Sequence, residues 1–194
     1  KSELEASLDG FSLGEKYLVV TYHPVTLENS TASEQIQNLL WALDEYLDYK
    51  VIFTLPNSDT DGRIIIQILN EYVAKNPGRA IAYPSLGIKR YLSALKYAKA
   101  VVGNSSSGII EVPSFGIPTL NIGDRQKGRL AADSVVNCGP QKEEILEGLK
   151  KVLYTEYKNI HNPYEGKNTT YDILRVLKNY PLEGLIQKRF YNIN

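Results

Sequence analysis

The chain has 194 residues, 43% of them hydrophobic, which is enough for one full core. Twenty-two basic residues balance twenty-two acidic ones, so no overall positive charge exists to hold a nucleic acid or an anionic membrane. The single cysteine, Cys138, excludes an intrachain disulfide and fits a reducing cytoplasm. No hydrophobic run approaches the roughly 18 to 20 residues that span a bilayer, and the opening KSELEASLDG lacks the apolar core of a signal peptide. We therefore expect a cytoplasmic protein that binds neither nucleic acid nor membrane, and the lack of methionine predicts a segment of a longer chain.

Short runs of β-branched and aromatic residues alternate with helical patterns along the first 155 residues. Such runs predict buried strands. The predicted strands are Tyr17 to Thr21, Val51 to Leu55, Ala80 to Ala82, Ala100 to Val102, Thr119 to Ile122 and Ser134 to Asn137.

Amphipathic helices are predicted between these strands. In the first, TASEQIQNLLWALDEYL, Thr31 and Glu34 form a capping-box pattern, and apolar residues from Ile36 to Leu47 fall on one face. Further helices are predicted from about Asp61 to Asn76, around Ile88 to Leu95 and around Ile145 to Val152. Strands and helices in this alternation predict an α/β fold with an open parallel sheet covered on both faces.

The tail changes character at the turn Asn162-Pro163-Tyr164-Glu165-Gly166. One more amphipathic helix is predicted around Tyr171 to Leu177, and it could pack on this domain or on one absent from the chain. After Pro181 we expect a short helix and a fraying end. These features predict a domain over residues 1–180 and an extension over 181–194.

The strongest candidate for a binding site is GNSSSGIIE, residues 103–111, which follows the strand that ends at Val102. Ligands of open parallel sheets collect at the carboxyl ends of strands, and a hydroxyl-rich loop at a helix start offers donors to phosphate oxygens. The hydroxyls of Ser105, Ser106 and Ser107 could donate to phosphate oxygens, and Glu111 could accept both hydroxyls of a ribose. The alternative interpretation of this loop is a helix cap, with Glu111 complementing the helix dipole.

Two other strand ends carry candidate residues. In GDRQKGR, residues 123–129, Arg125 is closest to its strand and is interpreted as a phosphate contact, whereas Lys127 and Arg129 fit a solvated basic loop. His23 follows the first strand, where it could donate to a phosphate or act as an acid toward a leaving group.

The second strand leads into LPNSDTDGR, residues 55–63. Asn57 could contact a base or a phosphate and Arg63 a phosphate, while Asp59 and Asp61 fit ordinary helix capping. The other histidine, His161, shares no ligand spacing with a cysteine or histidine, so no metal site is expected. Neither a P-loop nor a GxGxxG motif occurs, which disfavours ATP or dinucleotide binding.

The motifs TYHPVT, LPNSD, GNSSSGIIEVPSFGIPTLNIGDRQKGR and NPYEG, in this order, resemble the C-terminal half of the hydrolysing UDP-N-acetylglucosamine 2-epimerases of bacterial sialic-acid biosynthesis. The resemblance runs from about Lys16 to Leu177. It implies a Rossmann-like domain that holds UDP, one half of a two-domain architecture like that of B-type glycosyltransferases. The UDP contacts it implies are His23, Asn57, Arg63, Ser105, Ser106, Glu111 and Arg125.

The implied reaction is elimination of UDP across C1 and C2 followed by addition of water, which gives N-acetylmannosamine and needs no cofactor. The acid and base carboxylates would lie on an N-terminal domain that this chain lacks, so the isolated segment is expected to be inactive. Two alternatives stay open: the donor domain of a UDP-sugar glycosyltransferase, and a module that senses sugar nucleotides without chemistry. The sequence also leaves open the sugar, N-acetylglucosamine or a diacetamido sugar, and whether the full-length protein is a homo-oligomer.

Overall fold

The computed structural model describes residues 1–24, 31–57, 60–184 and 186. The chain divides into two compact units, Lys1–Tyr164 and Glu165–Asn194. Where the protein's domains end, including the expected boundary at residue 180, stays a prediction. Within the described ranges, the structure contains no helix with the length and apolar character of a membrane span.

The first unit is built on a six-stranded sheet in which every pair of neighbouring strands is parallel. The predicted open parallel sheet is therefore confirmed. Two strands have the predicted bounds, and each of the others differs by one residue at one or both ends. The strands, in the order β3-β2-β1-β4-β5-β6 across the sheet, are β1 (Tyr17–Thr21), β2 (Lys50–Thr54), β3 (Ala80–Tyr83), β4 (Ala100–Gly103), β5 (Thr119–Ile122) and β6 (Val135–Cys138).

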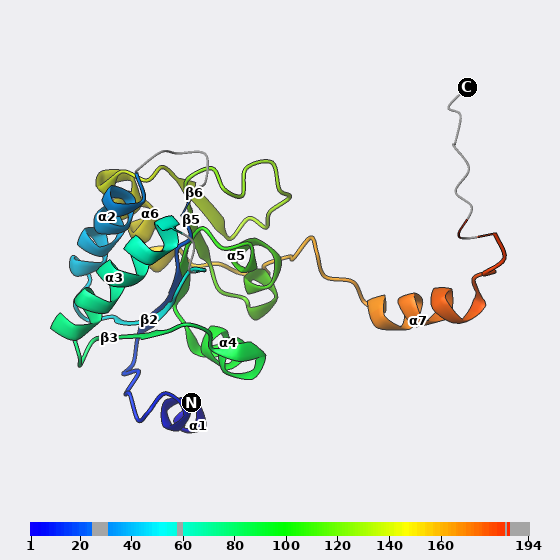
Figure 1. The fold of residues 1–194 in the computed structure, drawn as a ribbon, viewed down its shortest axis with the longest axis horizontal. Coiled ribbons are helices and arrows are strands. Elements are labelled where there is room, and N and C mark those ends of the chain that lie inside the picture. The colour runs from blue at the N-terminus through cyan, green and yellow to red at the C-terminus, as the bar shows by residue number, and fades with distance from the viewer. Residues whose placement is uncertain (25–30, 58–59, 185, 187–194) are drawn as a thin grey trace. The chain divides into compact units, whose positions relative to one another are not determined.

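Helices cover both faces of this sheet, as predicted (Figure 1). Alternate residues of β1 point to opposite faces: Val20 belongs to one buried cluster and Val19 to the other. One cluster is completed by α2 (Ala32–Asp44), α3 (Thr60–Lys75) and α6 (Lys142–Tyr154), and the other by α1 (Ser2–Ser7), α4 (Gly87–Tyr97) and the 3-10 helix η1 (Val112–Phe115).

The strand order reverses between β1 and β4, which are neighbours in the middle of the sheet. In open α/β sheets such a reversal opens a crevice at the carboxyl ends of the strands. Gly103, the last residue of β4, has φ +132°, and a Cβ there would lie 1.9 Å from the carbonyl oxygen of Thr21. Only glycine lets the loop after β4 start this close to the end of β1.

Several helix predictions need correction. Thr31 makes no side-chain cap to α2, because its φ and ψ of −91° and −9° are already helical, whereas a capping residue needs an extended backbone. Gln35 Nε2 instead donates to Thr31 Oγ1 at 3.1 Å. The helix ends at Asp44, so Leu47 does not join its apolar face and is 71% exposed. Helix α1 was not predicted, although Leu4 and Leu8 bury themselves in the core.

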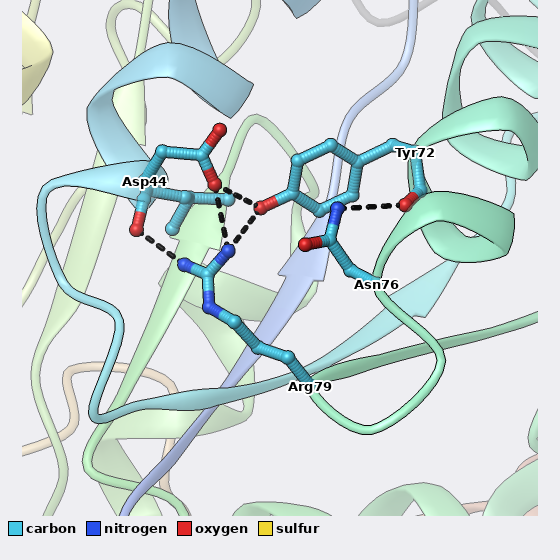
Figure 2. Close-up of polar contacts among 5 residues, drawn as sticks. Asp44, Tyr72, Asn76 and Arg79 are labelled. Atoms are coloured by element: carbon cyan, nitrogen blue, oxygen red, sulfur yellow. Dashed lines mark hydrogen bonds and ion pairs between the residues drawn. The ribbon is translucent and has the colours of Figure 1, made fainter.

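A polar cluster joins the ends of α2 and α3 to the start of β3, at the amino ends of the strands (Figure 2). Asp44 Oδ1 accepts hydrogen bonds from the hydroxyl of Tyr72 at 2.6 Å and from Nη1 of Arg79 at 2.7 Å. Arg79 also donates to the carbonyl of Leu43 and to the Tyr72 hydroxyl, and Asn76 Nδ2 donates to the Tyr72 carbonyl at 2.9 Å. We call Leu43, Asp44, Tyr72, Asn76 and Arg79 the Arg79 cluster. Its hydrogen bonds connect α2 and α3, which cover one face of the sheet.

The predicted turn after Asn162 is present, since Asn162 Oδ1 accepts from the N–H of Tyr164 at 3.0 Å. Asn162 is buried, and its Nδ2 donates to the carbonyl of Ile110 and to Ser114 Oγ at 2.8 and 2.7 Å. In the second unit the predicted amphipathic helix is α7 (Thr169–Asn179). The segment predicted after Pro181 lies largely outside the described residues.

Candidate nucleotide-binding site

The loop after β4 presents unused backbone donors at the carboxyl edge of the sheet. Within the described part of the chain, the N–H groups of Ser105 and Ser106 donate to no acceptor. Both serines are half-buried, and their carbonyls accept hydrogen bonds from the N–H groups of Gly108 and Ile109 at 3.2 and 3.0 Å, which hold this backbone in place. Two adjacent free N–H groups on a fixed loop can bind the oxygens of a phosphate.

The helix expected at this loop is much shorter than a typical helix. Helix α5 (Ser107–Ile110) has four residues and gives way to η1, which has Pro113 in its first turn. Glu111 stands between them as the residue that caps α5 and precedes η1. A four-residue helix has little macrodipole, so an anion here would depend on individual N–H groups and neighbouring cations.

Glu111 is held in place by a chain of hydroxyl groups. Ser107 Oγ donates to Glu111 Oε2, and the hydroxyls of Tyr91 and Ser107 lie 2.6 Å apart. Since the single proton of Ser107 goes to the carboxylate, Tyr91 is the donor in the second bond. Burial raises the pKa of Tyr91, which keeps that phenol protonated. Glu111 is exposed, with one carboxylate oxygen left for a further donor such as a ribose hydroxyl.

Asn104 is a residue of this site that the sequence did not single out. Its side chain is fully buried and binds the backbone of His23 on both sides: Oδ1 accepts from the His23 N–H and Nδ2 donates to the His23 carbonyl, each at 2.7 Å. The contact joins residues 81 positions apart, which no local pattern reveals. It places His23, at the end of β1, beside the loop that carries the two free amides.

Arg125 lies over the same loop. Its Nη1 donates to the carbonyl of Asn104 at 3.1 Å, and Gln126 Nε2 donates to the same oxygen at 2.9 Å. No carboxylate of residues 1–24, 31–57 and 60–184 forms an ion pair with Arg125. Its positive charge is therefore not neutralised within that part of the chain, which suits a site for an anion.

A pocket of about 370 Å³ adjoins the loop. His23, Ser105, Ser107 and Tyr91 line it on the side of β1 and β4, and the ends of β2 and β3 close it on the other. The remaining lining residues are Thr21, Thr54, Leu55, Pro84, Ser85, Leu86, Gly87 and Ile88. This volume lies within the range of small-molecule sites, and its mixture of apolar walls and hydroxyls fits a nucleoside.

The structure brings some predicted site residues together and leaves others apart. His23, Ser105, Ser106, Glu111 and Arg125 surround or adjoin the loop. Asn57 and Arg63 are exposed and do not line this pocket, so their roles stay predictions. Asp59 and the second half of HPVT lie outside the described residues.

In the basic loop after β5, Lys127 and Arg129 lie apart from the site that Arg125 adjoins. Lys127 pairs with Asp124 at 3.2 Å on the surface, as expected of a solvated loop. Lys127 and Arg129 line a second pocket of about 480 Å³, together with Gln126 and Cys138. Burial, with a smaller effect of Glu144, raises the pKa of the Cys138 thiol to about 12, so the thiol stays protonated at neutral pH.

Known proteins that resemble this chain identify its family. The family model for UDP-N-acetylglucosamine 2-epimerase matches residues 1–178. The chain belongs to this family. The chain shares its fold with the UDP-GlcNAc 2-epimerase of Neisseria meningitidis, solved bound to UDP-GlcNAc, on which it superposes with a TM-score of 0.63 and 22% identity over 92% of this chain and 48% of that one.

Two curated relatives in this epimerase family cover the whole chain. It is 41% identical over 198 residues to the GDP/UDP-N,N'-diacetylbacillosamine 2-epimerase (hydrolyzing) of Campylobacter jejuni, and the match covers 100% of this chain and 51% of that protein. It is 34% identical over 199 residues to the polysialic acid biosynthesis protein P7 of Escherichia coli, covering 100% and 50%. The chain therefore spans about half the length of these relatives.

Proposed function

We propose that this chain is the UDP-binding half of a hydrolysing UDP-sugar 2-epimerase. The main support is the juxtaposition of the two free amides of Ser105 and Ser106 with the unneutralised Arg125, in a member of the 2-epimerase family. The 41% identity to a hydrolysing enzyme favours hydrolysis over simple epimerisation. The domain that would carry the acid and base corresponds to the half of the relatives that this chain does not match.

In this proposal the diphosphate lies on the loop after β4. Ser105 and Ser106 donate to its oxygens and Arg125 neutralises part of its charge. Glu111, oriented by Ser107, accepts the hydroxyls of the ribose. The base enters the 370 Å³ pocket between Pro84 and Tyr91, where apolar walls can cover its faces. Asn57 and Arg63 would reach the nucleotide from the edge of β2.

The reaction begins with removal of the proton at C2 of the sugar. The C1–O bond then breaks, UDP leaves with the electron pair, and water adds across the resulting double bond, with the hydroxyl at C1 and the proton at C2. This chain would supply the stabilisation of the departing diphosphate, through donors already in place before charge develops. His23 would donate to the leaving group from the end of β1.

The proposal is tested on the full-length protein that contains this chain. UDP binding is measured by calorimetric titration. The release of UDP from UDP-N-acetylglucosamine and from a UDP-diacetamido sugar is then assayed without any acceptor. We expect UDP to bind and one of the sugars to be hydrolysed. Absence of UDP binding would overturn the proposal. Release of UDP only when an acceptor sugar is added would show a glycosyltransferase instead, and binding without turnover of either sugar would point to a sensor.

Substitution of His23 separates its proposed role from simple binding. His23→Asn should lower turnover more than it weakens UDP binding, because an acid toward the leaving group acts mainly in the transition state. Ser106→Ala keeps the free N–H but removes the hydroxyl expected to donate to a phosphate oxygen, so it should weaken UDP binding only in part. Lys127→Ala, which removes an exposed lysine paired with Asp124, is the matched control with no effect on either. Equal losses of turnover and affinity in His23→Asn would make His23 a ligand only.

The 34% identity to a protein of polysialic acid biosynthesis supports N-acetylmannosamine, a precursor of sialic acid, as one candidate product. The 41% identity to the bacillosamine enzyme supports a diacetamido sugar as the other. The two-sugar assay above decides between them.

A further inference from the structure

Asn104 makes hydrogen bonds on both sides of the proposed diphosphate site. Its side chain bridges the N–H and C=O of His23, and its own N–H donates to the carbonyl of Thr21 at 3.1 Å. Its carbonyl receives Arg125 and Gln126. One buried residue thus ties the end of β1, the loop after β4 and the turn after β5.

An asparagine suits this position because its amide offers an acceptor and a donor side by side. An aspartate would present a second oxygen to the His23 carbonyl, and an apolar side chain would leave both His23 backbone groups without partners in a buried place. Such unpaired groups cost more than the bonds contribute, so the bridge determines where His23 lies.

We propose that Asn104 is a positioning residue, which sets the spacing of His23 and Arg125 on the two sides of the Ser105–Ser106 loop so that both meet one diphosphate. This rests on the proposed function. Asn104 is fully buried, with its Oδ1 and one hydrogen of its Nδ2 bonded to His23 and its N–H to Thr21, so it is placed to act through its neighbours rather than on the substrate. The side chain holds the backbone of residue 104, whose carbonyl receives Arg125, and would affect UDP binding by that route; through His23 it would affect turnover. Both groups are fixed in advance and would otherwise lose freedom on binding.

A double-mutant cycle on the intact protein tests this route. UDP affinity is measured for the wild type, Asn104→Ala, Arg125→Ala and the double variant, at a temperature where thermal unfolding shows all four folded. When one residue acts through another, the effects of substituting the two on the free energy of binding do not add. We expect Asn104→Ala to weaken UDP binding about tenfold in the wild type and less than about twofold once Arg125 is gone.

Asn121→Ala is the matched control for general loosening of the fold. Asn121 is also a buried asparagine, 3% exposed, whose Nδ2 donates to Asn137 Oδ1 at 2.8 Å, but it contacts neither His23 nor Arg125. It should lower the melting temperature and leave UDP affinity within about twofold of the wild type. If Asn121→Ala weakens UDP as much as Asn104→Ala, the positioning role is overturned.

If Asn104→Ala does not fold, Asn104→Ser takes its place in the cycle. The shorter serine hydroxyl cannot bridge both His23 groups, so a smaller loss with the same dependence on Arg125 is expected. Equal losses with and without Arg125 would overturn the inference while leaving wild-type UDP binding, and hence the proposed function, intact. Failure of the wild type to bind UDP would instead overturn the proposed function.

Discussion

The Arg79 cluster and the polar residues around the loop after β4, Asn104, Ser105, Ser106 and Arg125, lie at opposite ends of the strands. They differ in the partner of their arginine; we call the second group the Arg125 cluster. In the Arg79 cluster, at the amino ends of the strands, the guanidinium meets the carboxylate of Asp44 at 2.7 Å and its side chain is 11% exposed. At the carboxyl ends, Arg125 is exposed, and among the described residues its guanidinium donates only to the carbonyl of Asn104, at 3.1 Å. Both clusters join segments far apart in the chain.

This difference separates a cluster that serves stability from one that is ready for a ligand. The positive charge of a guanidinium that pairs with a carboxylate is already neutralised, whereas a guanidinium that donates to a neutral carbonyl oxygen can still bind an anion. The free amides of Ser105 and Ser106 beside Arg125 add to the contrast. Substitutions in the first cluster should therefore change folding, and those in the second should change binding.

The largest expected effect on stability is at Gly103, the last residue of β4, directly before the loop that carries Ser105 and Ser106. Gly103→Ala puts a Cβ 1.9 Å from the Thr21 carbonyl oxygen, so β1 and β4 must separate and the free energy of unfolding should fall by at least about 3 kcal/mol. Chemical denaturation measures the loss. Gly116→Ala is the control: its φ of +69° is also positive, but no atom lies near its Cβ, so only about 1 kcal/mol should be lost. Equal losses would refute the close approach.

Arg79→Ala should lower the free energy of unfolding by about 2 to 3 kcal/mol, because Asp44 and Tyr72 lose a shared partner in a partly buried place. UDP affinity at a temperature where the variant is folded should not change. Denaturation and calorimetry on the same sample check both expectations. A large loss of UDP affinity would break the separation between the two ends of the sheet.

Arg125→Ala should give the reverse pattern. UDP binding should weaken by about 1 to 3 kcal/mol, the cost of removing a charged partner, whereas the free energy of unfolding should stay within about 0.5 kcal/mol of the wild type. The same two measurements apply, and the pair of arginine variants forms a crossed control. Unchanged UDP binding would remove Arg125 from the site.

The smallest effect is expected at Tyr72 and depends on pH. Burial first, and then the hydrogen bond to Asp44, raise the pKa of Tyr72 above its ordinary value, so the folded chain keeps the phenolic proton longer than the unfolded chain. This stabilisation is complete below about pH 10 and is lost as the pH rises further. Tyr72→Phe should cost about 1 kcal/mol at pH 8.

The gap in unfolding free energy between the wild type and Tyr72→Phe should therefore narrow above pH 10. Denaturation curves at a series of pH values measure it. The variant provides the control, because other tyrosines titrate in both proteins. A gap that stays constant to high pH would mean that Tyr72 ionises as easily in the folded chain as in the unfolded one.

The sheet could be predicted because buried parallel strands require runs such as Tyr17–Thr21 and Thr119–Ile122, a property of each segment alone. Helix ends were harder. Thr31 has the residue type of a cap but a helical backbone, and backbone conformation depends on surrounding contacts. Pro113, by contrast, is a signal visible in the sequence that the helix after Ser107 breaks.

Much of the candidate site could be found from strand ends, because topology brings the carboxyl ends of parallel strands to one edge. That rule leads to His23, Ser105, Ser106 and Arg125 without any knowledge of side-chain contacts. It cannot reveal Asn104, whose importance lies in its contacts with His23 and Arg125. Nor does it foresee Tyr91, which reaches Glu111 through Ser107 from the middle of α4.

The environment of Cys138 makes the protein convenient for site-specific labelling. With a pKa of about 12 the thiol holds its proton at neutral pH, and maleimides and iodoacetamides react with the thiolate. A second cysteine placed on the exposed loop after β5, as in Lys127→Cys, would be alkylated well before Cys138. A fluorophore could therefore be attached beside Arg125 in an otherwise unaltered chain, and nucleotide binding followed by its emission.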